Sequence, residues 1–187
     1  PVIETERVVL RAPQMSDYPA WAELRATSRD FLGPWEPLWA PDELSRASFR
    51  RRVRHYLRDM REDMGYALFV YDTRSTALVG GITLCNVRRG VTQSCTLGYW
   101  VGAAHAKRGY MTAAVRALVP VVFDSLELHR LEAACLPTNT ASMRLLKRVG
   151  FTREGLARRY LRINGDWRVP VLYALLETDS RGNGTGG

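Results

Sequence analysis

Hydrophobic and polar residues along this chain follow two different rhythms. Alternation with a period of two, which is typical of β-strands, occurs in short segments rich in β-branched and aromatic residues. These segments are residues 7–11, 66–71, 77–86, 93–101, 129–136, 151–163 and 169–176. Apolar residues three or four positions apart instead predict two helices before residue 65 and two more over residues 109–126 and 139–149. The predicted order of elements is therefore β-α-α-β-β-β-α-β-α-β-β.

Proline, glycine and polar residues mark the ends of several elements. The first helix, which carries Trp21 and Leu24, is expected to break within residues 30–37, where two prolines and a glycine cannot continue it. A second helix is expected to begin near Pro41. Its apolar stripe consists of Leu44, Phe49, Val53, Leu57, Met60 and Met64. Residues 164–166 (Asn-Gly-Asp) predict a hairpin between the last two strands.

The length of 187 residues suits one domain with a substantial core. We predict a single domain over residues 1–178 and a disordered, glycine-rich tail over residues 179–187. No apolar run approaches the roughly 20 residues of a membrane-spanning helix, and the first residues lack the features of a signal peptide. A cytoplasmic protein without membrane contact is expected.

Cysteine and histidine are few and dispersed. The three cysteines, Cys85, Cys95 and Cys135, fall inside predicted strands and match neither a disulfide framework nor a zinc motif. Buried, hydrophobic roles are the simpler interpretation for them. No metal site is predicted.

The formal charge of +8 is carried almost wholly by arginine. It suits an anionic partner such as a phosphate-bearing ligand, an acidic protein or RNA. Four arginines share one face of the second predicted helix: Arg50, Arg54, Arg58 and Arg61. This face is a candidate contact for the ribosome or RNA, although a merely solvated helix face has the same pattern.

Two segments in order have the features of an anion site. The strand 97–101 (LGYWV) runs into a basic, glycine-containing turn at residues 106–111 (AKRGYM), which opens a helix. Free N–H groups at a helix start bind phosphate well. About thirty residues later, Asn139 offers a helix cap and Ser142 a hydroxyl one turn further.

These motifs, in this order, resemble the Gcn5-related N-acetyltransferases (GNAT), and most of all the ribosomal-protein alanine N-acetyltransferases of the RimJ/RimL type. The resemblance covers roughly residues 4–177. It rests on residues 31–37 (FLGPWEP), 97–100 (LGYW), 129–133 (HRLEA), 137–142 (PTNTAS), 149–151 (VGF) and 160–167 (YLRINGDW). The implied fold is α/β (α+β): a mixed, mostly antiparallel sheet of about seven strands flanked by about four helices, splayed between strands four and five. Those two strands are residues 93–101 and 129–136.

The resemblance implies acetyl-CoA as co-substrate. The implied contacts are Tyr99, Trp100, Val101, Lys107, Arg108, Gly109, Tyr110, Met111, Thr112, Asn139 and Ser142. In the family, freed backbone groups of the splayed strand bond the pantetheine arm, and an N–H near Trp100 or Val101 would stabilise the oxyanion. The family's phosphate loop reads Gln/Arg-x-x-Gly-x-Gly/Ala, so Ala106 and Met111 depart from it while Gly109 keeps its place.

The implied catalytic residues are less uniform. Many relatives carry a proton-donating tyrosine seven residues after the asparagine, but here that position is Leu146. Ser142 is therefore the expected hydrogen-bond donor to the CoA sulfur, with Tyr160 in reserve. Glu36 and Glu132 are candidate bases, and pairing with arginine explains each equally well. Glu132 is expected among mostly apolar neighbours.

The implied acceptor groove lies between the first two helices and the last hairpin. Its candidate walls are Trp35, Glu36, Trp39, Tyr160 and Trp167. The first hypothesis is acetyl transfer to the N-terminal α-amine of an alanine- or serine-started protein, with ribosomal proteins among the candidates. A small-molecule amine, either a polyamine or an aminoglycoside, is the alternative acceptor. A non-catalytic, CoA-responsive binding module is the second alternative, and monomer and homodimer both remain open.

Overall fold

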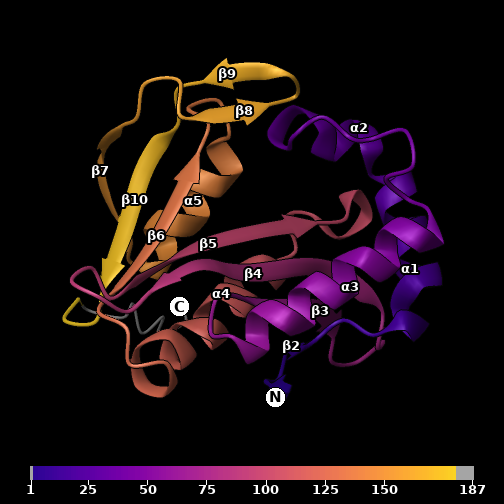
Figure 1. Cartoon of the computed structure of the whole chain (residues 1–187), viewed down its shortest axis with the longest axis horizontal. Helices are drawn as coiled ribbons and strands as arrows, with labels where there is room; N and C mark the ends of the chain where they lie inside the picture. The colour runs from indigo at the N-terminus through magenta and orange to yellow at the C-terminus, as the bar shows by residue number, and fades with distance from the viewer. Residues whose placement is uncertain (1, 180–187) are drawn as a thin grey trace.

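The computed structural model describes residues 2–179 and contains, within them, an eight-stranded sheet and a separate two-stranded hairpin (Figure 1). In spatial order the sheet consists of β1 (Val2–Glu4), β2 (Val8–Arg11), β3 (Tyr66–Asp72), β4 (Leu78–Arg88), β5 (Ser94–Val101), β6 (Arg130–Cys135), β10 (Val171–Leu176) and β7 (Thr152–Leu156). The hairpin consists of β8 (Leu161–Ile163) and β9 (Asp166–Arg168). All neighbours in the sheet are antiparallel except β5 and β6. The predicted mixed, mostly antiparallel sheet is confirmed.

Helices cover both faces of the sheet. They are α1 (Tyr18–Thr27), α2 (Arg29–Leu32), α3 (Arg46–Arg61), α4 (Tyr110–Pro120) and α5 (Thr140–Val149). The larger core cluster joins the sheet to α4 and α5, and a smaller one joins it to α1 and α3 through Trp21 and Phe49. Figure 1 shows α3 in front of the sheet and α4 behind it. Successive residues of each strand therefore face different helix layers.

The helical boundaries correct three expectations. The first helix breaks at Ser28, and residues 29–35 remain helical because Pro34 occupies the first turn of a short 3-10 helix, where its missing N–H costs nothing. The second long helix begins at Arg46 rather than near Pro41, because Ser45 caps it by accepting the Ser48 N–H. It ends at Arg61, which leaves Met64 outside the predicted apolar stripe and exposed.

The predicted last strand pair is also corrected. Residues 151–163 form not one strand but β7 and β8, and the hairpin at Asn164 and Gly165 joins the short β8 and β9. Both turn residues have positive φ (48° and 87°), as an Asn-Gly hairpin turn requires. The long strand β10 instead lies between β6 and β7. A further strand, β1, was not predicted.

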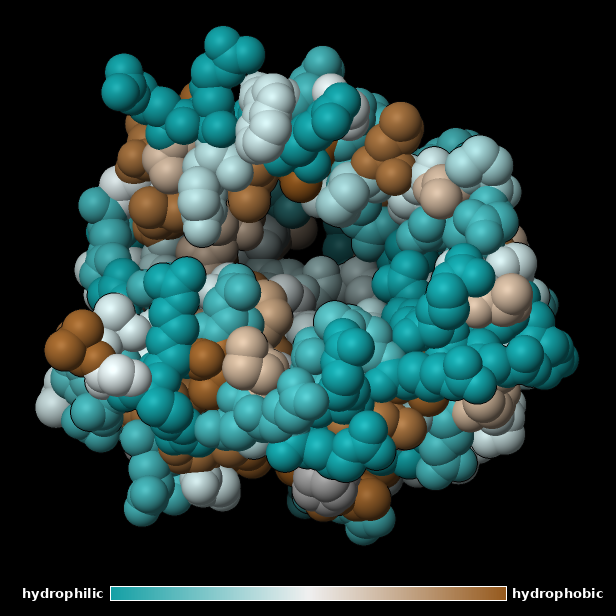
Figure 2. Space-filling model, viewed as in Figure 1, coloured by the Kyte–Doolittle hydropathy of each residue, from teal (hydrophilic) through white to brown (hydrophobic). Residues whose placement is uncertain are grey.

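The sheet splays where the family resemblance implies it. The parallel pairing of β5 with β6 runs from Ser94 to Leu97 and ends there, whereas the pairing of β5 with β4 continues to Val101. Residues 98–101 therefore have a hydrogen-bonded strand on one side only. Figure 1 shows β5 and β6 diverging, and Figure 2 shows the surface hollowed at this place.

Glycines allow the layers to approach each other beside the splay. A Cβ on Gly81 of β4 would lie 2.4 Å from Nε1 of Trp100, and one on Gly102 would lie 2.3 Å from Cδ1 of Leu24 in α1. Side chains at these two positions would push the Trp100 ring and α1 away from the sheet. By contrast, nothing lies within 4 Å of the Cβ position of Gly98, where the splay begins.

Candidate active site

The helix start predicted to bind phosphate is open. Gly109 is the N-cap of α4 with φ of +81°, and no side chain caps the helix there. No atom lies within 4 Å of its Cβ position, so a ligand can approach the first-turn N–H groups. Lys107 also has positive φ, and Lys107, Arg108 and Gly109 are all exposed. These features fit a pyrophosphate.

A residue that sequence reasoning missed fastens this turn to the sheet. The Arg7 guanidinium, which follows β1, donates to the Arg108 carbonyl and lies 4.6 Å from the ring centroid of Tyr110. The Tyr110 hydroxyl donates to Asp72, and this hydrogen bond raises the pKa of Tyr110 and lowers the pKa of Asp72. Because Arg7 is about a hundred residues upstream, no local pattern could have identified it.

Tyr110 and Met111 offer backbone rather than side-chain groups to a ligand. Both side chains are buried in the main core cluster. Thr112 is half-buried in the same first turn. Any contact of Tyr110 and Met111 with phosphate would therefore use their N–H groups, which tolerates the departure of Met111 from the family's small residue.

Asn139 and Ser142 meet Tyr99 at the start of α5. The Asn139 Oδ1 accepts the Ser142 N–H at 3.2 Å, so Asn139 caps the helix as predicted. The Tyr99 hydroxyl and Ser142 Oγ share a hydrogen bond. Ser142 is only 9% exposed. Burial raises the pKa of Tyr99 to about 12, although the hydrogen bond with Ser142 acts in the opposite direction. Tyr99 thus stays protonated at neutral pH.

Trp100, the next residue on β5, faces the opposite layer. Its ring and that of Trp39 lie 4.8 and 4.7 Å from the Arg25 guanidinium carbon. Arg25 is 5% exposed and donates two hydrogen bonds to Glu36, at 2.9 and 2.7 Å. The Trp39 Nε1 donates to the same carboxylate at 2.9 Å. We call Arg25, Glu36, Trp39 and Trp100 the arginine–tryptophan cluster.

The arginine–tryptophan cluster also holds the hairpin. The backbone N–H of Asn164, in the β8–β9 turn, donates to the Glu36 carbonyl at 2.8 Å. The loop after α2 and the hairpin therefore meet above the splay, as Figure 1 shows. The predicted location between the first helices and the hairpin is consistent with this contact.

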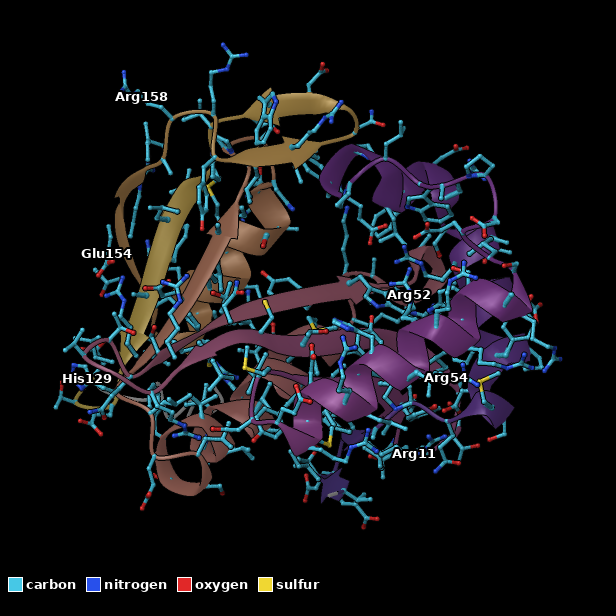
Figure 3. The ribbon with its side chains drawn as sticks, viewed as in Figure 1. Arg11, Arg52, Arg54, His129, Glu154 and Arg158 are labelled. Carbon is cyan, nitrogen blue, oxygen red and sulfur yellow. The ribbon has the colours of Figure 1, made fainter. Side chains whose placement is uncertain are left out.

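The surroundings of Glu132 differ from the expectation. Its side chain is 44% exposed and accepts a hydrogen bond from Arg130 Nε at 2.8 Å, so the expected apolar environment is wrong. Arg130 also binds Glu154 on β7 (Figure 3). Glu132 pairs with Thr96 in the parallel register, which puts it on the Trp100 face of the sheet, beside the splay. Strand alternation alone could not show which face was solvated.

The remaining predicted groove residues lie around the hairpin and the loop. Tyr160 and Trp167 are 61% and 54% exposed, and the Tyr160 N–H donates to the Arg168 carbonyl. Trp35 is half-buried in the short 3-10 helix after α2. None of the hydrogen bonds described for Tyr160 brings it to Ser142.

Two features are missing from the described residues, 2–179. No group of three or more His, Cys, Asp or Glu residues there is arranged to hold a metal ion. In the same range, no helix has the length and apolar character needed to cross a membrane.

Comparisons with known proteins agree with the fold. The family model for the acetyltransferase (GNAT) domain matches residues 7–152. The probable N-acetyltransferase YjcK of Bacillus subtilis is 32% identical over 178 residues, which cover 95% of this chain and 98% of that protein. The chain belongs to the GNAT acetyltransferase family.

Its relatives within the family include enzymes that modify ribosomal proteins. The [ribosomal protein uS5]-alanine N-acetyltransferase of Escherichia coli is 32% identical over 179 residues, covering 95% of this chain and 91% of that enzyme. The structure of Mycobacterium smegmatis RimJ in complex with CoA-disulfide superposes with a TM-score of 0.87 at 31% identity, covering 95% of this chain and 86% of that one. The predicted fold and the RimJ/RimL resemblance are confirmed.

Proposed function

We propose that this enzyme transfers the acetyl group of acetyl-CoA to the N-terminal α-amine of a protein beginning with alanine or serine, ribosomal proteins being the first candidates. The observation that carries this proposal is the free edge of β5 at residues 98–101, with the Tyr99–Ser142 pair on one face and the arginine–tryptophan cluster on the other. The relative from E. coli, which acetylates an alanine on a ribosomal protein, supports the choice of acceptor.

The chain's own groups would hold the co-substrate at two places. The first-turn N–H groups of α4, with Lys107 and Arg108 adding positive charge, bind the pyrophosphate. Unpaired backbone groups of Tyr99, Trp100 and Val101 bind the pantetheine arm and the thioester oxygen. When bound there, acetyl-CoA supplies a thioester acetyl group that an amine can attack directly.

Ser142 acts as the acid in this proposal. Its Oγ–H donates to the sulfur as the thiolate leaves, and this role requires the Tyr99 hydroxyl to be the donor in the hydrogen bond that the two residues share. A tyrosine that remains protonated at neutral pH suits this role, since only the neutral hydroxyl can donate. Ser142 would therefore replace the tyrosine that many relatives carry where this chain has Leu146.

Glu132 is the stronger of the two candidate bases. The Glu36 carboxylate already accepts three hydrogen bonds, two from Arg25 and one from Trp39, so it is better suited to position the loop. Glu132 is bound on one oxygen by Arg130 and is largely exposed beside the splay. An α-amine titrates near 7.7–8.0, so removal of its proton through one water molecule would suffice.

The contact between the hairpin and the loop after α2, which lies above the splay, favours a chain end as acceptor. The hairpin is bonded to the loop after α2, and Figure 2 shows a hollow beside this contact, which is the proposed entrance for an extended N-terminus. The carboxylates Glu36 and Glu132 are both paired with arginine, which disfavours a polycationic small amine.

A cytoplasmic location remains a prediction. Monomer and homodimer both remain open.

The test is thiol release from acetyl-CoA with peptides beginning with alanine, serine or methionine, and separately with spermidine and an aminoglycoside. Turnover with the alanine or serine peptide, with mass spectrometry locating the acetyl group on the α-amine, is expected. Turnover with the small amines alone would transfer the acceptor to the alternative class. Binding of acetyl-CoA without turnover on the whole panel and on ribosomal proteins would favour the binding module.

A further inference from the structure

The exposed face of α3 carries an unusual density of positive charge. Seven of its sixteen residues are arginine, and one, Asp59, is acidic. Four of the arginines are exposed at helical spacing and form what we call the arginine stripe: Arg50, Arg54, Arg58 and Arg61. The rise of a helix makes this stripe ~16 Å long. It lines the outer face of the molecule, where Figure 3 shows Arg54 pointing away from the sheet.

The charges of the arginine stripe are largely uncompensated. Among the described residues, no carboxylate lies within salt-bridge distance of Arg50, Arg54 or Arg61. Arg58 contacts the His55 ring, and Asp59 is paired with the same histidine at 3.1 Å. The neighbouring Arg51 and Arg52 have carboxylate partners instead, Asp42 and Glu43. Like charges four residues apart destabilise a helix. The arginine stripe therefore lowers the stability of α3 itself.

The stripe borders a shallow concavity of about 430 Å³. It is lined by Arg51, Arg54, His55, Leu57, Arg58 and Arg61. Leu57 is 40% exposed, and the ring in this lining is that of His55, whose two nitrogens are already bound to Arg58 and Asp59. The groups on offer are therefore guanidinium forks, which match phosphate oxygens.

A regular line of charge distinguishes between two kinds of anionic partner. Successive arginines of the stripe are three or four residues apart, positions whose Cβ atoms lie about 5–6 Å from each other on a helix face. Nucleic-acid phosphates also repeat along a line, whereas carboxylates on a folded protein are scattered. The spacing therefore favours a nucleic-acid backbone over an acidic protein.

The arginine stripe and the proposed acceptor opening share one face of the molecule. In Figure 2 the hydrophilic side chains over α3 lie directly beside the central hollow. A partner bound along α3 would thus bring whatever it carries to the opening. This fits an acceptor that is presented while attached to RNA.

We propose that the arginine stripe is a sequence-independent docking surface for the phosphate backbone of duplex RNA, which positions an RNA-bound protein for acetylation. The RNA-binding part of this proposal is argued from α3 alone. The positioning of a protein for acetylation rests on the proposed function. Contacts to phosphate release counterions, so binding should weaken steeply as salt increases.

The experiment measures binding of a fluorescent duplex RNA to the full chain at several salt concentrations. The test variant is Arg50→Gln/Arg54→Gln/Arg61→Gln, because glutamine preserves helix propensity. The control is Arg88→Gln/Arg116→Gln/Arg148→Gln, three exposed arginines away from α3 with the same change in net charge. We expect the test variant to lose at least tenfold in affinity, and its log–log salt slope to fall by about 0.9 per arginine. The control should change the slope by less than one unit.

Equal losses in the two variants, or none in the test variant, would overturn the proposal. Binding of poly-glutamate but not RNA through the same arginines would overturn it in favour of an acidic protein. Acetylation of a free alanine-started peptide is measured in parallel and should be unchanged in both variants. Peptide turnover without stripe-dependent RNA binding refutes the docking surface alone, and stripe-dependent binding without turnover refutes the proposed acceptor alone.

Discussion

Tyr99 and Trp100 are neighbours on β5, of similar size and similar burial, yet the fold uses them differently. Tyr99 points toward α5 and shares a hydrogen bond with Ser142. Trp100 points toward α1, where it lies against a buried guanidinium and above a glycine. One contact involves a proton that can move, and the other fixes the position of a loop. Under the proposed function, the alternation of side chains along this splayed strand would direct Tyr99 and Trp100 to different substrates.

Because Tyr99 and Trp100 have different contacts, mutations on their two faces should change different properties, turnover on one face and stability on the other. Changes on the Tyr99 face should affect turnover with little effect on stability, because the groups there are hydroxyls at a helix start. Changes on the Trp100 face should affect stability first, because a charge is buried there and its contacts join three segments, namely α1, the loop after α2 and β5. The predictions below separate the two faces, starting with the largest effect.

Arg25→Ala should reduce the free energy of unfolding by about 3 kcal/mol or more, because it leaves the mostly buried Glu36 carboxylate without its charged partner. Urea denaturation measures this loss. Arg11→Ala, which removes a more exposed ion pair with Asp17, serves as the comparison. An Arg25 variant as stable as the wild type would contradict the structural role of the Trp100 face.

Ser142→Ala should lower kcat about 100-fold, the usual scale for loss of a positioned proton donor, which corresponds to about 2.7 kcal/mol in the barrier. Affinity for CoA, measured by calorimetry, should change little. Ser48→Ala, at a cap far from the splay, is a matched serine control for stability. Unchanged turnover in Ser142→Ala would exclude Ser142 as the acid.

Tyr99→Phe should lower kcat about tenfold and leave KM for acetyl-CoA nearly unchanged, because Ser142 keeps its own proton but loses the donor behind it. The diagnostic comparison is with Trp100→Phe, which should mainly lower the midpoint of unfolding. If Trp100→Phe costs as much kcat as Tyr99→Phe while remaining fully stable, the two faces do not differ as described.

The smallest expected effect is an absence of pH dependence. Because burial raises the pKa of Tyr99 to about 12, the ratio of wild-type to Tyr99→Phe kcat should stay constant from pH 7 to 10. The stability that this shift contributes is complete below the ordinary tyrosine pKa of about 10 and is lost as the pH rises through about 12. A ratio that declines toward one before pH 10 would place the Tyr99 pKa in the ordinary range.

Local pattern was enough for the features that depend on neighbouring residues. The alternation in residues 93–101, the cap at Asn139 and the Asn-Gly turn predicted β5, α5 and the hairpin. Gly109 was identified because a basic turn before a helix has a recognisable sequence. The splay was implied by the resemblance to a family, since no pattern of residues in β5 marks where its pairing with β6 ends.

Contacts between distant residues explain what the sequence did not predict. Arg7 reaches the phosphate turn, and Arg25 reaches Glu36, only after the chain has folded. The irregularity within β7 lies at Gly155, whose φ of 149° accompanies a register shift against β10 at Leu172. The solvated face of Glu132 depends on Arg130 and Glu154, which lie on two different strands.

Gly98 offers a practical handle for protein engineering. It lies at the point where β6 leaves β5, on the Glu132 face, and nothing occupies the space that a side chain would fill. Its hydrogen-bonded pairing with β4 uses only backbone, so larger residues can be introduced without disturbing that strand. A graded series from alanine to leucine at this position would set the width of the acceptor opening one methyl group at a time, and would turn one enzyme into a set of catalysts graded by acceptor size.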